Sequence, residues 1–119
     1  MYTFEKLIVW NESRELVKMV YELVENYPST EKYALIDQMK RASVGIVSNI
    51  AEGSARITPK DKGHFYSIAY SSSMELVSQI FISIDLGYTN SKKADIVLQK
   101  IGNVSRLLNG LRNSTLKLN

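Results

Sequence analysis

Cysteine is absent from the 119 residues, and histidine occurs once, as His64. Without cysteine the chain can form no disulfide, thiolate metal site or thiol nucleophile, and the composition fits a reducing cytoplasm. A single histidine excludes the paired Glu-x-x-His motifs of di-iron bundles. Gly45, Gly53 and Gly63 are too widely spaced to form a phosphate-binding loop. We therefore expect neither a metal nor another cofactor.

Long apolar runs are also missing. No uninterrupted apolar segment approaches the roughly 18 residues that a membrane span needs, and the first short apolar run follows Glu5. The length and the hydrophobic content of 45% fit a single domain over residues 1–119. We expect a soluble, cytoplasmic protein with no membrane partner.

Catalytic patterns are equally scarce. The serine-rich stretch 67–83 invites comparison with serine hydrolases, but no Gly-x-Ser-x-Gly elbow occurs, and His64 lies about two turns away on the same predicted helix. Glu52 and Glu75 are expected to be half-buried carboxylates. Arg41 and Arg56 offer them a simpler role as ion-pair partners than acid-base catalysis would. We expect a protein that is not an enzyme, with no catalytic residue and no small-molecule substrate.

Helical periodicity, by contrast, runs through the whole sequence. Apolar residues recur at helical spacing over residues 7–26, 31–55, 59–85 and 92–113. Pro28 ends the first helix, and Ser29 or Thr30 is expected to cap the second. Thr58 should cap the third helix, and residues 86–90 should form the last turn, with Gly87 just after the end of the third helix. Asn90 or Ser91 is expected to cap the fourth helix. Short turns between four helices predict an all-α fold, an antiparallel up-down-up-down four-helix bundle.

The inward faces of the last two helices are predicted from their apolar positions. Those of the third helix are Phe65, Ile68, Ala69, Leu76, Val77, Ile80, Phe81 and Ile84. Those of the fourth step by three and four residues and are Ala94, Val97, Ile101, Val104, Leu108 and Leu111. This heptad spacing suits left-handed bundle packing.

Residues 38–53 have the most unusual pattern, because the helix that they form carries two distinct faces. One is apolar. The second carries polar or very small residues: Gln38, Arg41, Gly45, Ser48, Asn49 and Glu52. Glycine in an exposed helix interior costs roughly 1 kcal/mol relative to alanine, so Gly45 indicates that another backbone approaches closely. We expect this second face, together with Glu75, to pack against another helix or another subunit with its charges paired; a solvated polar stripe is the alternative.

The same segment carries a family signature. The run Gln-x-x-Arg-Ala-x-x-x-Ile-x-x-Asn-Ile-Ala-Glu-Gly over residues 38–53 resembles that of the 23S ribosomal RNA intervening-sequence protein family, to which the accessory variability determinant of diversity-generating retroelements is also similar. Further matching motifs lie at residues 7–10, 27–28, 33–35 and 68–76. Tyr70 and Ser71 stand where the family usually has a basic residue and glycine. The resemblance implies a four-helix bundle that assembles as a homopentamer, and some relatives look like partners of RNA, DNA or reverse transcriptase.

The net charge of +3 is unevenly distributed, since residues 87–119 hold six basic side chains against Asp95 alone. Basic surfaces of this kind can bind phosphate backbones, although a modest surplus is also typical of a solvated face. No interleaved aromatic residues mark a base-stacking strip, so any contact should be independent of sequence. The candidate nucleic-acid-binding residues are Arg56, Lys60, Lys62, Lys92, Lys93, Lys100 and Arg106.

Two functions remain open. The first is a self-associating module that binds RNA or DNA through several copies of a basic patch. The second is a structural or scaffolding oligomer whose partner is another protein, such as a reverse transcriptase, with the basic surface serving solubility alone.

Overall fold

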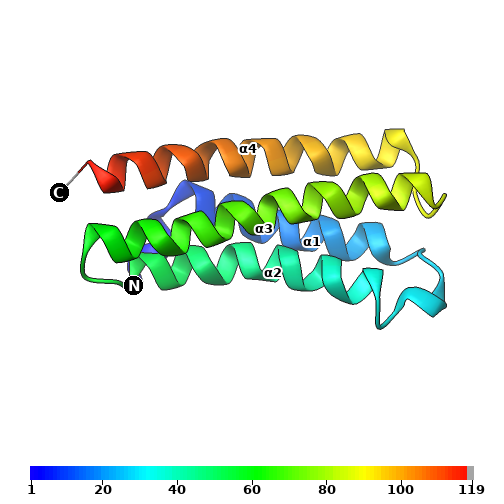
Figure 1. Ribbon diagram of the computed structural model, residues 1–119, viewed down its shortest axis with the longest axis horizontal. Helices are drawn as coiled ribbons and strands as arrows, with labels where there is room; N and C mark the ends of the chain where they lie inside the picture. The colour runs from blue at the N-terminus through cyan, green and yellow to red at the C-terminus, as the bar shows by residue number, and fades with distance from the viewer. Residues whose placement is uncertain (118–119) are drawn as a thin grey trace.

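The computed structural model describes residues 1–117 of the chain. Its main elements are the helices α1 (Ile8–Val24), α2 (Leu35–Ser54), α3 (Pro59–Asp85) and α4 (Ser91–Leu116), with the short 3-10 helices η1 (Thr3–Lys6) and η2 (Ser29–Glu31). The four α-helices lie side by side in a bundle of 47 × 23 × 22 Å, and each runs opposite to the one before it (Figure 1). The predicted all-α four-helix bundle is confirmed, and the helix directions agree with up-down-up-down order. No helix in the described residues has the length and apolarity to cross a membrane.

Two of the three connections follow the predicted capping chemistry. The Thr58 side-chain oxygen accepts a hydrogen bond of 3.1 Å from the Asp61 backbone N–H, and Pro59 is the first residue of α3. At the next turn, Asn90 Oδ1 accepts one of 2.9 Å from the Lys93 backbone N–H. Gly87 has a φ of +76°, a left-handed conformation that favours glycine. These local interactions fix the starts of α3 and α4.

The start of α2 differs from the prediction. Residues 31–34 do not extend the helix, and neither Ser29 nor Thr30 caps it, because α2 begins at Leu35 after Ala34 with φ −122° and ψ −105°. The side chain of Tyr33 is 86% exposed, and Lys32 and Ala34 are exposed as well. An extra helical turn is not stable in water without apolar burial. The segment therefore forms η2 and a turn instead.

The core is built from aliphatic residues of all four helices. Those that are fully buried include Leu16, Val20, Met39, Ile46, Ile50, Leu76, Ile80, Ile101, Val104 and Leu108. The heptad seam of α4 is confirmed, with its first five members buried and Leu111 half-buried. Burial of each such side chain contributes about 1.5–3 kcal/mol, so these residues supply most of the stability of the bundle.

The inward face of α3 was predicted only in part. Ala69, Leu76 and Ile80 are buried, but Ile68 and Phe81 are exposed. Their places on the inward face are taken by Tyr66, Ser73, Gln79 and Ser83. Because α3 has large apolar residues on both its inward and its outward side, the pattern alone does not identify the buried side.

Small hydroxyl residues are buried within the helix packing. Ser13, Ser43 and Ser73 are fully buried, and each donates a hydrogen bond to the backbone carbonyl three residues before it. Their polar groups are thus satisfied within their own helices, and their small volume lets neighbouring helices approach.

Candidate interaction surfaces

The second face of α2 is open in the described chain. Gln38, Arg41, Ser48 and Glu52 are exposed, while Gly45 and Asn49 are half-buried. Within the described chain no helix covers these exposed residues, so the predicted packing against another helix or another subunit stays a prediction for another subunit. Glu52 and Glu75 are also exposed rather than half-buried. What remains for this face is solvent or another subunit.

The charged residues of this face are paired with residues four positions away in the sequence. Arg41 Nε lies 2.9 Å from Asp37 Oδ2, and Arg56 Nη2 lies 2.6 Å from Glu52 Oε1. Glu52 thus has Arg56 as its partner, as expected, whereas Arg41 pairs with Asp37. Exposed pairs one helical turn apart contribute only a few tenths of a kcal/mol. Arg41 and Glu52 thus have ion-pair partners in their own chain, and no second surface is needed to pair their charges.

A neighbouring backbone does not approach Gly45 closely as predicted, and the close packing occurs instead against side chains at Gly53. A Cβ on Gly45 would lie 3.7 Å from Ser72 Oγ, which is ordinary contact. A Cβ on Gly53 would lie 2.7 Å from Cε1 of the buried Tyr66 ring. The packing of α2 on α3 therefore requires glycine at 53 and tolerates a side chain at 45.

Instead, Gly45 helps to form a hollow on the outward side of α2. The hollow has a volume of about 540 Å³, and its lining residues are Tyr21, Asp37, Lys40, Arg41, Val44, Gly45 and Ser48. We call it the α2 hollow. It contains Arg41 and Ser48, two of the four exposed α2 residues of the predicted packing face.

The candidate basic residues do not form one patch. Arg56, Lys60 and Lys62 lie at the α2–α3 turn, whereas Lys92 and Lys93 start α4 at the other end of the bundle (Figure 1). The bundle is 47 Å long, so these two groups are separated by most of the molecule.

Lys100 is engaged within the bundle. Its ammonium nitrogen lies 2.8 Å from Glu12 Oε2 and 2.5 Å from Glu15 Oε2, and its side chain is only 14% exposed. Burial lowers the pKa of Lys100, but the hydrogen bonds and charges of the two carboxylates outweigh burial and hold its pKa above the usual value. The same hydrogen bond lowers the pKa of Glu15. Lys100 thus joins α4 to α1 and is poorly placed for phosphate contact, whereas Arg106 is exposed.

Replacing Lys100 with methionine is expected to lower stability at pH 7, because Glu12 and Glu15 lose their shared partner. The lowered pKa of Glu15 contributes stability above its usual value of 4.5, and this contribution is lost as the pH falls through the lowered value. The gap between wild type and variant should therefore shrink at pH 3. Urea unfolding at both pH values measures it, and an equal gap at each would contradict this account.

One end of the bundle is more basic than the other. At the α2–α3 end, Arg56, Lys60 and Lys62 are joined by Lys117, because the last turn of α4 packs there: a Cβ on Gly63 would lie 2.6 Å from Leu116 Cδ2. We call these four residues the basic pole. Acidic residues at this end include Glu52 and Asp61, whereas those close to the α3–α4 turn in sequence include Asp85 and Asp95. Lys117 was not among the predicted residues, although the antiparallel topology itself places it there.

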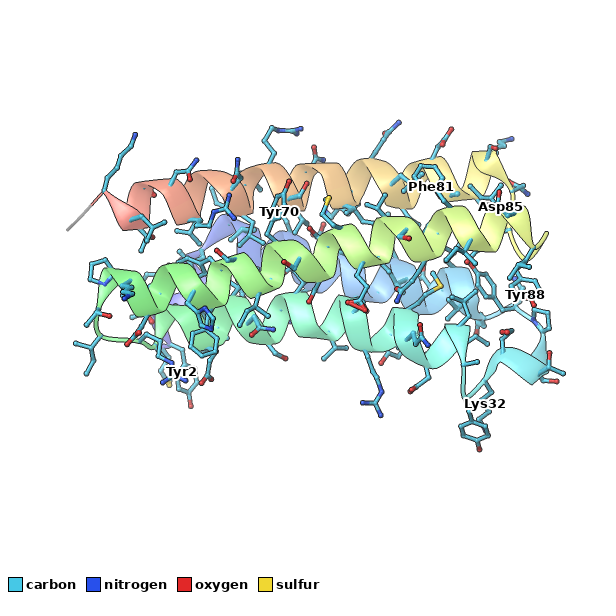
Figure 2. All side chains as sticks on the ribbon, in the orientation of Figure 1. Tyr2, Lys32, Tyr70, Phe81, Asp85 and Tyr88 are labelled. Carbon is cyan, nitrogen blue, oxygen red and sulfur yellow. The ribbon has the colours of Figure 1, made fainter. Side chains whose placement is uncertain are left out.

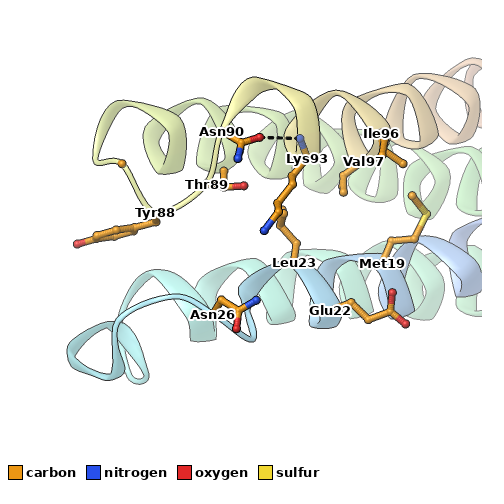
Figure 3. Close-up of a pocket in the computed structure, with 11 residues that line it drawn as sticks. Met19, Glu22, Leu23, Asn26, Tyr88, Thr89, Asn90, Lys93, Ile96 and Val97 are labelled. Carbon is orange, nitrogen blue, oxygen red and sulfur yellow. Dashed lines mark hydrogen bonds between the residues drawn. The ribbon is translucent and has the colours of Figure 1, made fainter.

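A groove between α1 and α4 lies near the α3–α4 turn (Figure 3). It has a volume of about 450 Å³, with Met19, Leu23 and Ile96 among its apolar lining residues. Lys93 extends across it from α4 toward α1 (Figure 3). The described residues include no group of three or more side chains suited to hold a metal ion.

Comparison with known proteins identifies the family. The family model of the 23S rRNA-intervening sequence protein matches residues 5–110. The chain belongs to this family. The match begins in η1 and reaches well into α4, so the resemblance read from the short motifs is confirmed.

A solved relative has the same fold. It is a protein with unknown function from the S23 ribosomal protein family of Bacteroides thetaiotaomicron, with a TM-score of 0.79 and 18% sequence identity. The likeness covers 88% of this chain and 98% of that chain, and at this identity it shows the fold alone. No curated protein matches the chain. Neither the family description nor the solved relative names a catalytic activity.

Proposed function

We propose that this family member is a homo-oligomeric bundle without enzymatic activity that binds the phosphate backbone of RNA or DNA independently of sequence. The observation that carries the proposal is the basic pole, where the cations of the α2–α3 turn and Lys117 at the end of α4 lie at one end of the bundle. Arg56, Lys60 and Lys117 are exposed there, and Lys62 is half-buried with its ammonium group 2.9 Å from the Ser54 carbonyl oxygen.

Assembly into an oligomer would raise the affinity for nucleic acid, because a single basic pole offers only a few cations. A few lysine and arginine contacts bind phosphates weakly, and each contact adds to the dependence on salt. Several linked copies convert later contacts into intramolecular ones and raise the overall affinity. A pentamer, as the family resemblance implies, would present five basic poles on one particle.

A titration with labelled single-stranded RNA and DNA tests the proposal. Fluorescence polarisation at about 50 and 200 mM salt should show binding that weakens steeply as salt increases. Replacing Lys60 and Lys117 with glutamate should weaken binding at least about tenfold, because four units of charge change at the basic pole. No binding at low salt would exclude the nucleic-acid function.

A matched control distinguishes the effect of the position of the charges on affinity from the effect of the net charge. Replacing Lys32 and Lys92 with glutamate makes the same charge change at the opposite end, and both residues are exposed. This variant should keep most of the affinity. Equal losses in the two variants would show that net charge, rather than the basic pole, governs binding.

Exposed apolar residues favour a second candidate function, a scaffold that assembles with itself or with a protein such as a reverse transcriptase. Phe81 and Ile82 are exposed on the outward side of α3. Apolar side chains of this size suit contact with protein rather than with phosphate. Light scattering combined with the titration distinguishes the candidates: an oligomer that binds neither nucleic acid supports the scaffold.

A further inference from the structure

The outward side of α3 carries a group of large apolar residues flanked by acids. Met74, Phe81 and Ile82 are 40%, 54% and 44% exposed. Ser78, Glu75 and Asp85 are exposed on the same side. Figure 2 shows Phe81 and Asp85 together on the C-terminal half of α3. We call these six residues the α3 patch.

Helical spacing makes the α3 patch a continuous surface rather than a set of scattered side chains. Met74, Phe81 and Ile82 are related by steps of seven and eight residues, so they lie on one side of the helix. Single exposed apolar residues are common, but contiguous ones on an outward helix face are typical of interaction sites. The inward side of α3 is already buried by Leu76 and Ile80. The patch is thus additional to what the fold itself needs.

The α2 hollow has complementary properties. Its charged lining includes Lys40 and Arg41, with Asp37 as the acid in the lining. Val44 is exposed within it and offers an apolar contact. Gly45 leaves room where any other residue would place a side chain. Two cations against one acid leave this lining with a net positive charge, with Arg41 paired to Asp37 and Lys40 Nζ 4.6 Å from the centre of the Tyr21 ring. The α3 patch is apolar and carries two acids, Glu75 and Asp85.

We infer that the α3 patch of one copy docks into the α2 hollow of the next copy of this chain. The inference rests on the self-association in the proposed function and names the two surfaces that form the contact. Phe81 and Ile82 would bury their exposed area against Val44 and the space above Gly45. Glu75 and Asp85 would then lie near Lys40 and Arg41, which favours this pairing over contact between two like surfaces.

The α3 patch and the α2 hollow of the same chain cannot contact each other. Gly45 lies opposite Ser72 of α3, so Phe81 is nine residues farther along the bundle, about 13 Å at 1.5 Å per residue. Both surfaces also face outward. Contact between different surfaces is head-to-tail, and it generates a closed ring when the rotation between copies closes. It also accounts for Gly45, which packing within the chain does not require.

Disulfide trapping tests the contact directly, because the chain has no cysteine of its own. Ser48→Cys places a thiol in the α2 hollow, and Ser78→Cys places one in the α3 patch. Both serines are exposed, so the substitutions should not disturb folding. Mixing the two variants under oxidising conditions should give a cross-linked dimer. Neither variant alone should do so, and a chain carrying both should form a ladder of cross-linked species.

Other patterns of trapping overturn the inference. Dimers of Ser48→Cys alone or Ser78→Cys alone, with none in the mixture, would show contact between like surfaces. A bridge within one chain is excluded by geometry, because the two sites are too far apart along the axis for a disulfide. Oligomers of wild-type mass with no mixed cross-link would assign assembly to different surfaces.

Substitution of the anchor residue gives an independent readout. Phe81→Glu should raise the concentration at which the oligomer dissociates at least about tenfold, as expected for a central apolar anchor. Gly45→Leu, which fills the α2 hollow, should have the same effect. Ile57→Glu is the matched control, because Ile57 is an exposed apolar residue on the α2–α3 turn, outside both surfaces.

The outcomes separate this inference from the proposed function. A wild-type protein that is monomeric by light scattering at about 100 μM would overturn both the proposed assembly and the contact inferred from it. An oligomer that neither Phe81→Glu nor Gly45→Leu weakens, with circular dichroism unchanged, would overturn the contact alone. An oligomer weakened by both variants and not by Ile57→Glu supports it.

Discussion

Replacing Ile80 with alanine is expected to lower the free energy of unfolding by about 3–4 kcal/mol, among the largest effects of any single substitution in this protein. Ile80 is fully buried on the inward side of α3 and belongs to the core cluster of the bundle. The substitution removes buried apolar volume and leaves a cavity that the other three helices can fill only in part. Urea unfolding followed by circular dichroism measures the loss.

Ile82 provides a chemically identical control two residues away. Its side chain is substantially exposed on the outward side of α3, so Ile82→Ala should cost less than about 1 kcal/mol at concentrations where the protein is monomeric. The same variant should weaken the assembly inferred above. Equal destabilisation by the two substitutions in the monomer would mean that α3 is rotated relative to its neighbours.

Gly53→Ala is expected to destabilise the bundle by about 2 kcal/mol, although alanine is the better helix former. The new Cβ would lie 2.7 Å and 2.9 Å from two ring carbons of Tyr66 and 3.1 Å from Phe65 Cβ. Tyr66 is buried, so its ring has little freedom to move away. Relief of the clash requires α2 and α3 to separate along their contact. Thermal and urea unfolding measure the loss.

Gly102→Ala is the matched control. Apart from its chain neighbours and the backbone of its own helix, no described atom lies within 4 Å of the position that its Cβ would occupy, so the gain in helix propensity should appear without a clash. We expect this variant to be more stable than wild type by about 0.5–1 kcal/mol. If Gly53→Ala were also stabilising, close helix packing would not be the reason for glycine at this position of the family signature.

The sequence predicted the parts of the fold that depend on local chemistry and on a single apolar face. Thr58, Gly87 and Asn90 determine turns through their own side chains or backbone conformations, and each acts as predicted. The seam of α4 was predictable because its apolar residues, apart from Ile96, Leu98, Leu107 and Leu116, lie on one side. The order and packing of the helices then follow from the short connections.

The remaining features depend on contacts between distant residues. Phe81 and Ile80 are both apolar, and only the packing of α3 against its neighbours determines which is buried. Gly45 and Gly53 look alike in the sequence, yet only Gly53 lies against an aromatic ring of another helix. Tyr33 continues a helical pattern, but it is 86% exposed and gains little apolar burial, so α2 starts at Leu35 instead of the predicted residue 31.

The candidate surfaces, too, were predicted where they depend on residues close together in the sequence and missed where they depend on distant ones. The sequence identified the polar face of α2 and the cations of the α2–α3 turn, but it could not show that Lys100 is held by Glu12 and Glu15. Those carboxylates are 85 or more residues away in the chain. Lys117 was missed for the converse reason, because only the antiparallel path of α4 brings it to the basic pole.

The unequal charge of the two ends has a consequence for any ring built from this bundle. If neighbouring copies are related by rotation about an axis parallel to the helices, every basic pole points the same way. The particle would then have one cationic side and one side of mixed charge, so a strand could bind to only one of them. Saturation would occur at one strand per particle when the strand is long enough to follow the rim, and at one per subunit when it is short.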